Sequence, residues 1–135
     1  SELGVPPEKM LFTIPYFGYE WPTMDYFPGA KTTGPATILA YGSGAPDLPS
    51  ARERAALYGK LRDTESGSPY YAYQDSLGWH QGWFDDADSI AEKYAFGVAQ
   101  GLGGVAIFPL SYGDRELMLT LTTARAERLA SRSSP

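Results

Sequence analysis

Two short apolar runs place the strongest limit on how this chain can fold. Residues 10–17 (MLFTIPYF) and 103–110 (GGVAIFPL) are almost continuously apolar, a pattern typical of strands buried on both faces of a parallel sheet. Helical patterns over 88–100 and 115–130 flank the second run, and this order of elements indicates an α/β fold. Two such strands cannot cover each other or close a sheet. The sequence therefore predicts one part of a larger α/β domain.

A small α+β element separates the two apolar runs. Aromatic segments at 69–74 and 82–84 are predicted to pair as a hairpin across the turn-rich tetrapeptide 75–78. We divide the chain into three parts of one incomplete domain: a lead-in and strand over 1–21, an α+β insertion over 22–84, and a last helix, strand and helix over 85–135.

Helix starts are marked by two capping-box spacings. Ser50 with Glu53 predicts the start of a short helix, and Ser89 with Glu92 predicts the start of the longer helix over 88–100. The N-terminal residues SELGVPPEK lack both an initiator Met and the apolar core of a signal peptide, so we interpret them as a cut end.

Composition excludes several classes of function. The net charge of −5, from 16 acidic and 11 basic residues, provides no basic stripe for nucleic acid or for an anionic membrane surface. No apolar stretch has the length of a membrane span, and the absence of cysteine excludes disulfides and thiolate chemistry. His80 is the only histidine and has no carboxylate pair at ligand spacing. We therefore predict no metal and no cofactor.

Two segments of the chain resemble a known family. Residues 5–21 (VPPEKMLFTIPYFGYEW) are similar to the seventh barrel strand of family 18 glycoside hydrolases, the chitinase and peptidoglycan-glucosaminidase group. Residues 67–114 resemble the end of that family, with its insertion hairpin, its tryptophan and acidic pair before a helix, and its GLGGV eighth strand. Residues 22–66 match only as a variable insert. The resemblance implies the C-terminal part of a (β/α)8 TIM barrel with an inserted α+β subdomain.

The resemblance also implies a chemistry of which this chain holds only a part. In the family the N-acetyl group of the substrate is the nucleophile, and a glutamic acid at the end of a D-x-x-D-x-D-x-E strand protonates the leaving oxygen. Neither this pattern nor the sixth-strand tyrosine that holds the N-acetyl group occurs in the 135 residues. We therefore assign no catalytic residue. The implied partner is a glycan that contains N-acetylglucosamine, and the family favours a secreted or cell-envelope location.

Five aromatic residues are candidates for sugar binding. Phe108 stands where the family usually has the tryptophan under the scissile sugar, and it keeps a π face with less area. The other candidates are Tyr16, Tyr19 and Trp21, at and beyond the end of the first apolar run, and Trp79 in the hairpin. Each has a packing alternative, which is favoured for Tyr16. Trp83 is predicted to pack the hairpin onto the following helix.

Two functional hypotheses remain. In the first, the chain is the carbohydrate-binding portion of a family 18-like hydrolase, acting on chitin or peptidoglycan once completed by the N-terminal part of the barrel. In the second, it is a non-catalytic glycan-binding or protein-interaction module derived from that fold. Both predict that exposed inner faces of the two apolar strands pair with the missing N-terminal barrel segment or drive self-association.

Overall fold

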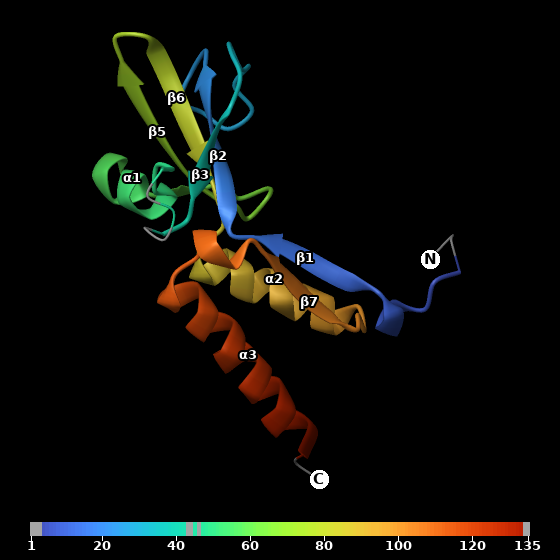
Figure 1. The fold of residues 1–135 in the computed structure, drawn as a ribbon. Coiled ribbons are helices and arrows are strands. Elements are labelled where there is room, and N and C mark those ends of the chain that lie inside the picture. The colour runs from blue at the N-terminus through green and yellow to red at the C-terminus, as the bar shows by residue number, and fades with distance from the viewer. Residues whose placement is uncertain (1–3, 43–44, 46, 134–135) are drawn as a thin grey trace.

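The computed structural model describes residues 4–42, 45 and 47–133, which form two separate sheets and three α-helices (Figure 1). A parallel pair holds β1 beside β7, and a five-stranded antiparallel sheet has the order β3-β2-β6-β5-β4. The strands are β1 (Leu11–Pro15), β2 (Phe17–Thr23), β3 (Thr37–Ala40), β4 (Leu61–Arg62), β5 (Pro69–Asp75), β6 (Gly78–Trp83) and β7 (Gly104–Phe108). The helices are α1 (Ala51–Tyr58), α2 (Ala87–Ala99) and α3 (Arg115–Ser133), with 3-10 turns at Pro7–Lys9 and Leu110–Tyr112. The mixed α/β class predicted from the sequence is confirmed.

The first apolar run is two strands rather than one. The single strand predicted over 10–17 is wrong, because the chain turns at Tyr16 and leaves the parallel pair for the five-stranded sheet. The Tyr16 amide donates to the Phe108 carbonyl at 2.9 Å, which closes the parallel pair at this point. Gly18 then lets β2 pass close to β6, since a Cβ there would lie 2.2 Å from the Trp83 carbonyl oxygen. Only Phe17 of β2 belongs to the run, so the turn at Tyr16 falls between two apolar residues, Pro15 and Phe17.

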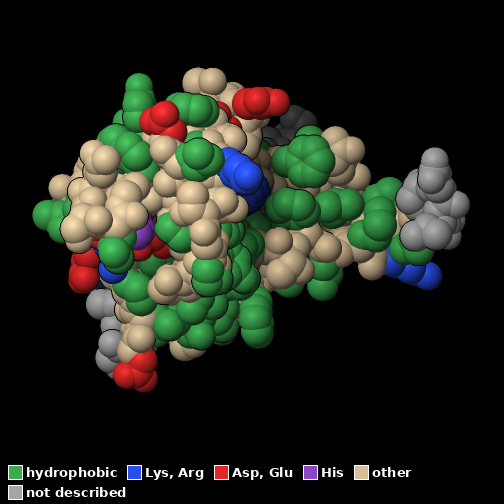
Figure 2. Space-filling view, turned by 90° about the horizontal axis from the view of Figure 1, so that it is seen from above, with side chains coloured by type: hydrophobic (Ala, Val, Ile, Leu, Met, Phe, Trp, Pro, Cys, Tyr) green, Lys and Arg blue, Asp and Glu red, His purple; other side chains and the backbone are tan. Residues whose placement is uncertain are grey.

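The parallel pair is covered on one side only. Phe12 and Ile14 face α2 and α3; Ile14 is fully buried, and the Phe12 ring lies 6.0 Å from that of Phe96. The opposite side leaves Leu11 and Phe108 exposed at 64% and 65%. In Figure 2, which views the molecule from above, hydrophobic side chains gather along the parallel pair of β1 and β7.

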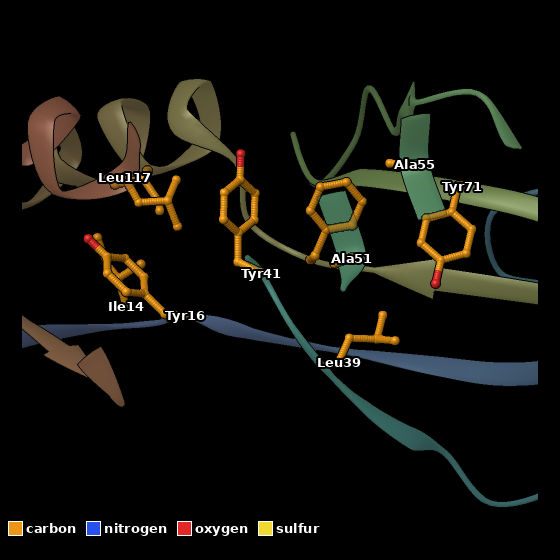
Figure 3. Packing of buried hydrophobic residues seen from close by; sticks show 10 residues of the cluster. Ile14, Tyr16, Leu39, Tyr41, Ala51, Ala55, Tyr71 and Leu117 are labelled. Atoms are coloured by element: carbon orange, nitrogen blue, oxygen red, sulfur yellow. The ribbon is translucent and has the colours of Figure 1, made fainter. Parts of the chain in front are cut away.

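One buried cluster joins the parallel pair to the five-stranded sheet. Tyr41 lies between the group formed by Ile14, Tyr16 and Leu117 and the group formed by Leu39, Tyr71, Ala51 and Ala55 (Figure 3). Helix α1 covers one face of the five-stranded sheet, and its start is capped by Ser50, whose hydroxyl accepts from the Glu53 amide at 3.3 Å. The predicted hairpin is confirmed, with its second strand beginning at Gly78, earlier than expected.

The N-cap of helix α2 lies three residues before the predicted one. The Ser89–Glu92 capping box is wrong: Asp86 is the N-cap, and Ser89 is the third helical residue. The Asp86 carboxylate accepts from the Ser89 amide at 3.0 Å, while the Ser89 hydroxyl accepts from the Asp86 amide at 2.9 Å. Asp86 also binds the Lys60 ammonium at 2.7 Å, so one residue caps α2 and ties it to the segment after α1.

This cap makes stability depend on pH. Burial raises the pKa of Asp86, but the hydrogen bonds from Lys60 and from the Ser89 amide outweigh it and hold the pKa below the usual 3.8. A depressed folded-state pKa contributes stability that is complete above about pH 5 and is lost as the pH falls through the folded pKa, below 3.8. We expect Asp86→Asn to flatten the fall in unfolding free energy below pH 4, measured by urea denaturation at several pH values. Asp88→Asn, on an exposed neighbour, is the control and should leave that fall unchanged.

Candidate functional site

A row of aromatic side chains follows β2 on the face of the sheet opposite α1. Successive strand residues point to opposite faces, so Phe17, Tyr19 and Trp21 share this face. Their ring centroids are 5.6 Å apart between Phe17 and Tyr19 and 5.4 Å apart between Tyr19 and Trp21. Tyr19 is 40% exposed, and Phe17 and Trp21 are half-buried.

The neighbouring strands extend this surface. Strand β6 pairs Trp83 with Tyr19 and Gln81 with Trp21. The Trp83 indole also stacks on Tyr70 of β5, with ring centroids 4.6 Å apart and planes 13° from parallel. We call this surface the aromatic face; it consists of Phe17, Tyr19, Trp21, Tyr70, Trp79 and Trp83. Ring contacts therefore run along β2 from Phe17 to Trp21 and from β6 to β5 between Trp83 and Tyr70.

Phe108 lies where the two sheets meet. It is the last residue of β7, directly opposite Pro15, and its ring lies on the side of the parallel pair away from α2 and α3. In Figure 1 the parallel pair lies beyond the base of the five-stranded sheet, with α2 and α3 along one side of it. Phe108, which is exposed, and the partly exposed aromatic face are therefore two aromatic surfaces that each point away from the helices packed on their own sheet.

The reverse face of the sheet holds a buried carboxylate that is fully bound. Glu20 is 8% exposed and accepts from Arg54 Nη1 at 2.8 and 2.7 Å, from the Tyr71 hydroxyl at 2.5 Å and from the Tyr73 hydroxyl at 3.1 Å. Burial raises the pKa of Tyr71, and the adjacent Glu20 charge raises it further, so this phenol stays a neutral donor. Glu20 therefore holds α1 to the sheet and does not face the exposed side.

The sequence-predicted site residues fall into two groups. Tyr19, Trp21 and Trp79 belong to the aromatic face, where Trp79 is half-buried and its ring lies 5.5 Å from that of Tyr26; Phe108 is exposed at the end of β7. Tyr16 is misplaced: it is 1% exposed, its ring lies against Gly113, and its hydroxyl donates to Met118 Sδ at 3.8 Å. A buried ring cannot stack on a ligand, so Tyr16 is a core residue.

Sequence reasoning missed Trp83. It was expected to pack against the following helix, but it stacks on Tyr70 and lines a pocket of the aromatic face. The signal that could have found it is the period-two spacing of Trp79, Gln81 and Trp83, which places all three side chains on one face of a strand. No pattern of neighbouring residues in the sequence predicts that Trp83 pairs with Tyr19 across the sheet.

The remaining titratable groups in the described part of the chain form no metal site. Among residues 4–42, 45 and 47–133, no group of three or more His, Cys, Asp and Glu side chains is arranged to hold an ion. His80 stacks on Tyr73 at 4.8 Å, and its Nε2 lies 3.2 Å from an Asp75 carboxylate oxygen. Within the same residues no helix is long and apolar enough to cross a membrane.

Comparison with known proteins gives consistent matches. The sequence profile described as "Glycosyl hydrolases family 18" matches residues 1–113. "Di-N-acetylchitobiase" of Rattus norvegicus is 29% identical over 130 residues, covering 85% of this chain and 35% of the relative. "Chitinase C" of Streptomyces lividans is 31% identical over 112 residues, covering 82% and 16%. The solved chitinase from Chromobacterium violaceum ATCC 12472 has a TM-score of 0.69 at 26% identity, over 90% and 34%. The chain spans no more than 35% of the length of these three proteins.

Proposed function

The chain belongs to glycosyl hydrolase family 18, and on that premise we propose that it is the carbohydrate-binding portion of a glycoside hydrolase. The substrate class is β-1,4-linked N-acetylglucosamine polymers, chitin or peptidoglycan. The observation that carries the proposal is the pair of aromatic surfaces, exposed Phe108 and the partly exposed aromatic face, each pointing away from the helices packed on its sheet. The C–H faces of a sugar pack on such rings, while their polar edges reach its hydroxyl groups.

The proposal places β1 and β7 as the last two strands of a (β/α)8 barrel. The side of the pair away from the helices holds Thr13, Gly104 and Ala106, small side chains of the kind that alternate with larger ones inside a barrel. Phe108 ends this side at the carboxyl end of β7, where barrel enzymes build their sites. The partner of the open side is the N-terminal part of the barrel or, in its absence, a second copy of this chain.

In this proposal the chain binds and orients sugar, and the acid acts from elsewhere in the enzyme. The 135 residues contain no D-x-x-D-x-D-x-E pattern, and Glu20 is fully bound within the sheet. A second candidate is a non-catalytic glycan-binding module. The observation that favours it is Phe108, which offers less stacking area than the tryptophan that usually stands there and has no N–H donor.

The test is a titration of the 135-residue chain with chitotetraose, four β-1,4-linked N-acetylglucosamine units, followed by tryptophan emission and calorimetry. We expect saturable binding, weakened about thirtyfold by Phe108→Ala, because burial of a full Phe side chain contributes about 2 kcal/mol to binding. The matched control is Phe96→Ala on α2, a phenylalanine 54% exposed on the helical side, which should leave the affinity unchanged.

Hydrolysis assays separate the two candidates. The chain alone should release no reducing ends from chitotetraose, and turnover by the chain alone would contradict the role assigned to it. Adding the N-terminal barrel portion of the same protein should produce turnover if the chain completes a hydrolase, and none if it is a binding module. Absence of any chitotetraose binding would overturn both candidates.

A further inference from the structure

A pocket of about 340 Å³ opens on the aromatic face beneath the loop that follows β2. Trp21, Gln81 and Trp83 line it from the sheet, and Gly29, Ala30 and Thr32 line it from the loop. Its volume is at the lower end of the range for ligand pockets and matches one sugar-sized ring. Phe108 does not line this pocket, so the pocket is separate from the exposed aromatic surface at Phe108.

The loop is held over the sheet by its own backbone. Thr23 and Thr32 form an antiparallel β-bridge. The Met24 amide donates to the Lys31 carbonyl at 2.9 Å, and the Thr33 amide donates to the Pro22 carbonyl at 2.8 Å. These bonds continue β2 into a short hairpin whose tip includes Gly29 at φ +81°. The loop therefore has a fixed root and forms a wall of the pocket.

Gln81 connects this loop to the indole of Trp83. It is 2% exposed, and its Nε2 donates to the carbonyls of Asp25 and Phe27, both at 2.9 Å. Its Oε1 accepts from Trp83 Nε1 at 3.0 Å. The buried Gln81 amide thus donates two hydrogen bonds to the loop and accepts one from the Trp83 indole, and Tyr70 stacks on that indole.

The lining identifies the chemistry of the ligand. It contains two indoles, two threonine hydroxyls and a glutamine, and none of its residues is ionisable. A charged ligand would find no counter-charge there, and burying its charge unpaired would be costly. A neutral pyranose offers an apolar C–H face to the indoles and hydroxyl groups to Thr32 and the loop backbone.

We propose that this pocket is a second pyranose-binding site, distinct from Phe108, in which Trp21 and Trp83 contact the sugar and Gln81 is the positioning residue. The proposal rests on the proposed function, since it assigns a further unit of the same glycan to the insertion. Because Gln81 holds both walls, its removal acts through Trp83 and the loop rather than through the sugar itself.

The test measures chitotetraose affinity by calorimetry in single and double variants. We expect Trp83→Phe and Gln81→Leu each to weaken binding about tenfold. Trp83→Phe removes part of the aromatic contact with the sugar and leaves the Gln81 Oε1 without its donor. Gln81→Leu leaves the indole N–H and two loop carbonyls without partners, so both walls lose their fixed arrangement. Gln81→Leu with Trp83→Phe should weaken binding by less than the product of the two single effects, because the part that acts through Trp83 is already lost, whereas Gln81→Leu with Phe108→Ala should multiply the two effects. A merely structural role for Gln81 would not give this difference. Gln74→Leu, at an exposed glutamine on β5, is the matched control and should bind as the parent does.

Each outcome decides between defined alternatives. Binding that depends on Phe108 but not on Trp83 or Gln81 would overturn this pocket and leave the proposed function standing. No binding by the parent chain would overturn both. If Gln81→Leu does not fold, Gln81→Glu keeps the acceptor for Trp83 and removes both donors to the loop. Affinity unchanged in Gln81→Glu and in Trp83→Phe would then reject the pocket.

Discussion

Replacing Glu20 by alanine is expected to lower the free energy of unfolding by about 3 kcal/mol, within the range of about 3–5 kcal/mol for removing one partner of a buried ion pair. The carboxylate is 8% exposed and accepts four hydrogen bonds from three side chains. Tyr71 is fully buried, so removal of the carboxylate leaves its hydroxyl without an acceptor. The same change frees the Arg54 guanidinium from the sheet. Arg54 is one-third exposed and recovers some hydration, which keeps the loss at the lower end of that range.

Glu92→Ala is the matched control. Glu92 also pairs with an arginine, Arg62, at 2.6 Å, but its side chain is 66% exposed. An exposed pair of this kind contributes little, so we expect a change within about 0.5 kcal/mol. Urea denaturation followed by far-UV circular dichroism measures both variants. Equal losses for Glu20→Ala and Glu92→Ala would show that the buried network does not hold α1 to the sheet.

Local signals in the sequence were sufficient for the elements but not for their pairing. The turn at 75–78 and the cap at Ser50 are short-range patterns, and both are found where the sequence predicts them. The cap of α2 was misplaced because Asp86 and Ser89 carry the same spacing three residues earlier, and only the geometry distinguishes the two. The apolar run at 10–17 gave no sign of a turn at Tyr16, because the residues on both sides of the turn are apolar.

The candidate site depends on contacts that no local pattern contains. Tyr16 and Tyr19 are similar aromatics three positions apart, yet one is buried against Gly113 and the other is exposed. What separates them is the switch of the chain from one sheet to the other. The pairing of Tyr19 with Trp83 joins strands more than sixty residues apart in the chain, and the Gln81 clamp requires a loop fold that the proline- and glycine-rich sequence does not specify.

Gly82→Ala is expected to destabilise the five-stranded sheet strongly although it adds a single methyl group. A Cβ at Gly82 would lie 2.1 to 2.4 Å from ring atoms and the hydroxyl of Tyr71, its partner across the β5–β6 pair. Tyr71 cannot move aside, because its hydroxyl is bound to Glu20 at 2.5 Å and its ring lies 5.9 Å from that of Tyr58. Overpacking at a site that cannot relax costs about 3 kcal/mol.

Gly104→Ala provides the comparison, because its Cβ would meet only the flexible end of Leu11 at 3.4 Å. We expect Gly104→Ala to change the unfolding free energy by less than about 1 kcal/mol. The double variant Gly82→Ala with Tyr71→Ala identifies the cause: once the ring is gone, the added methyl group has space, so the double variant should be no less stable than Tyr71→Ala alone. Additive losses in the double variant would place the cost of Gly82→Ala in the backbone of β6 instead of in the Tyr71 ring. In that case the Tyr71 ring would not be the group through which packing at Gly82 affects the Glu20 network.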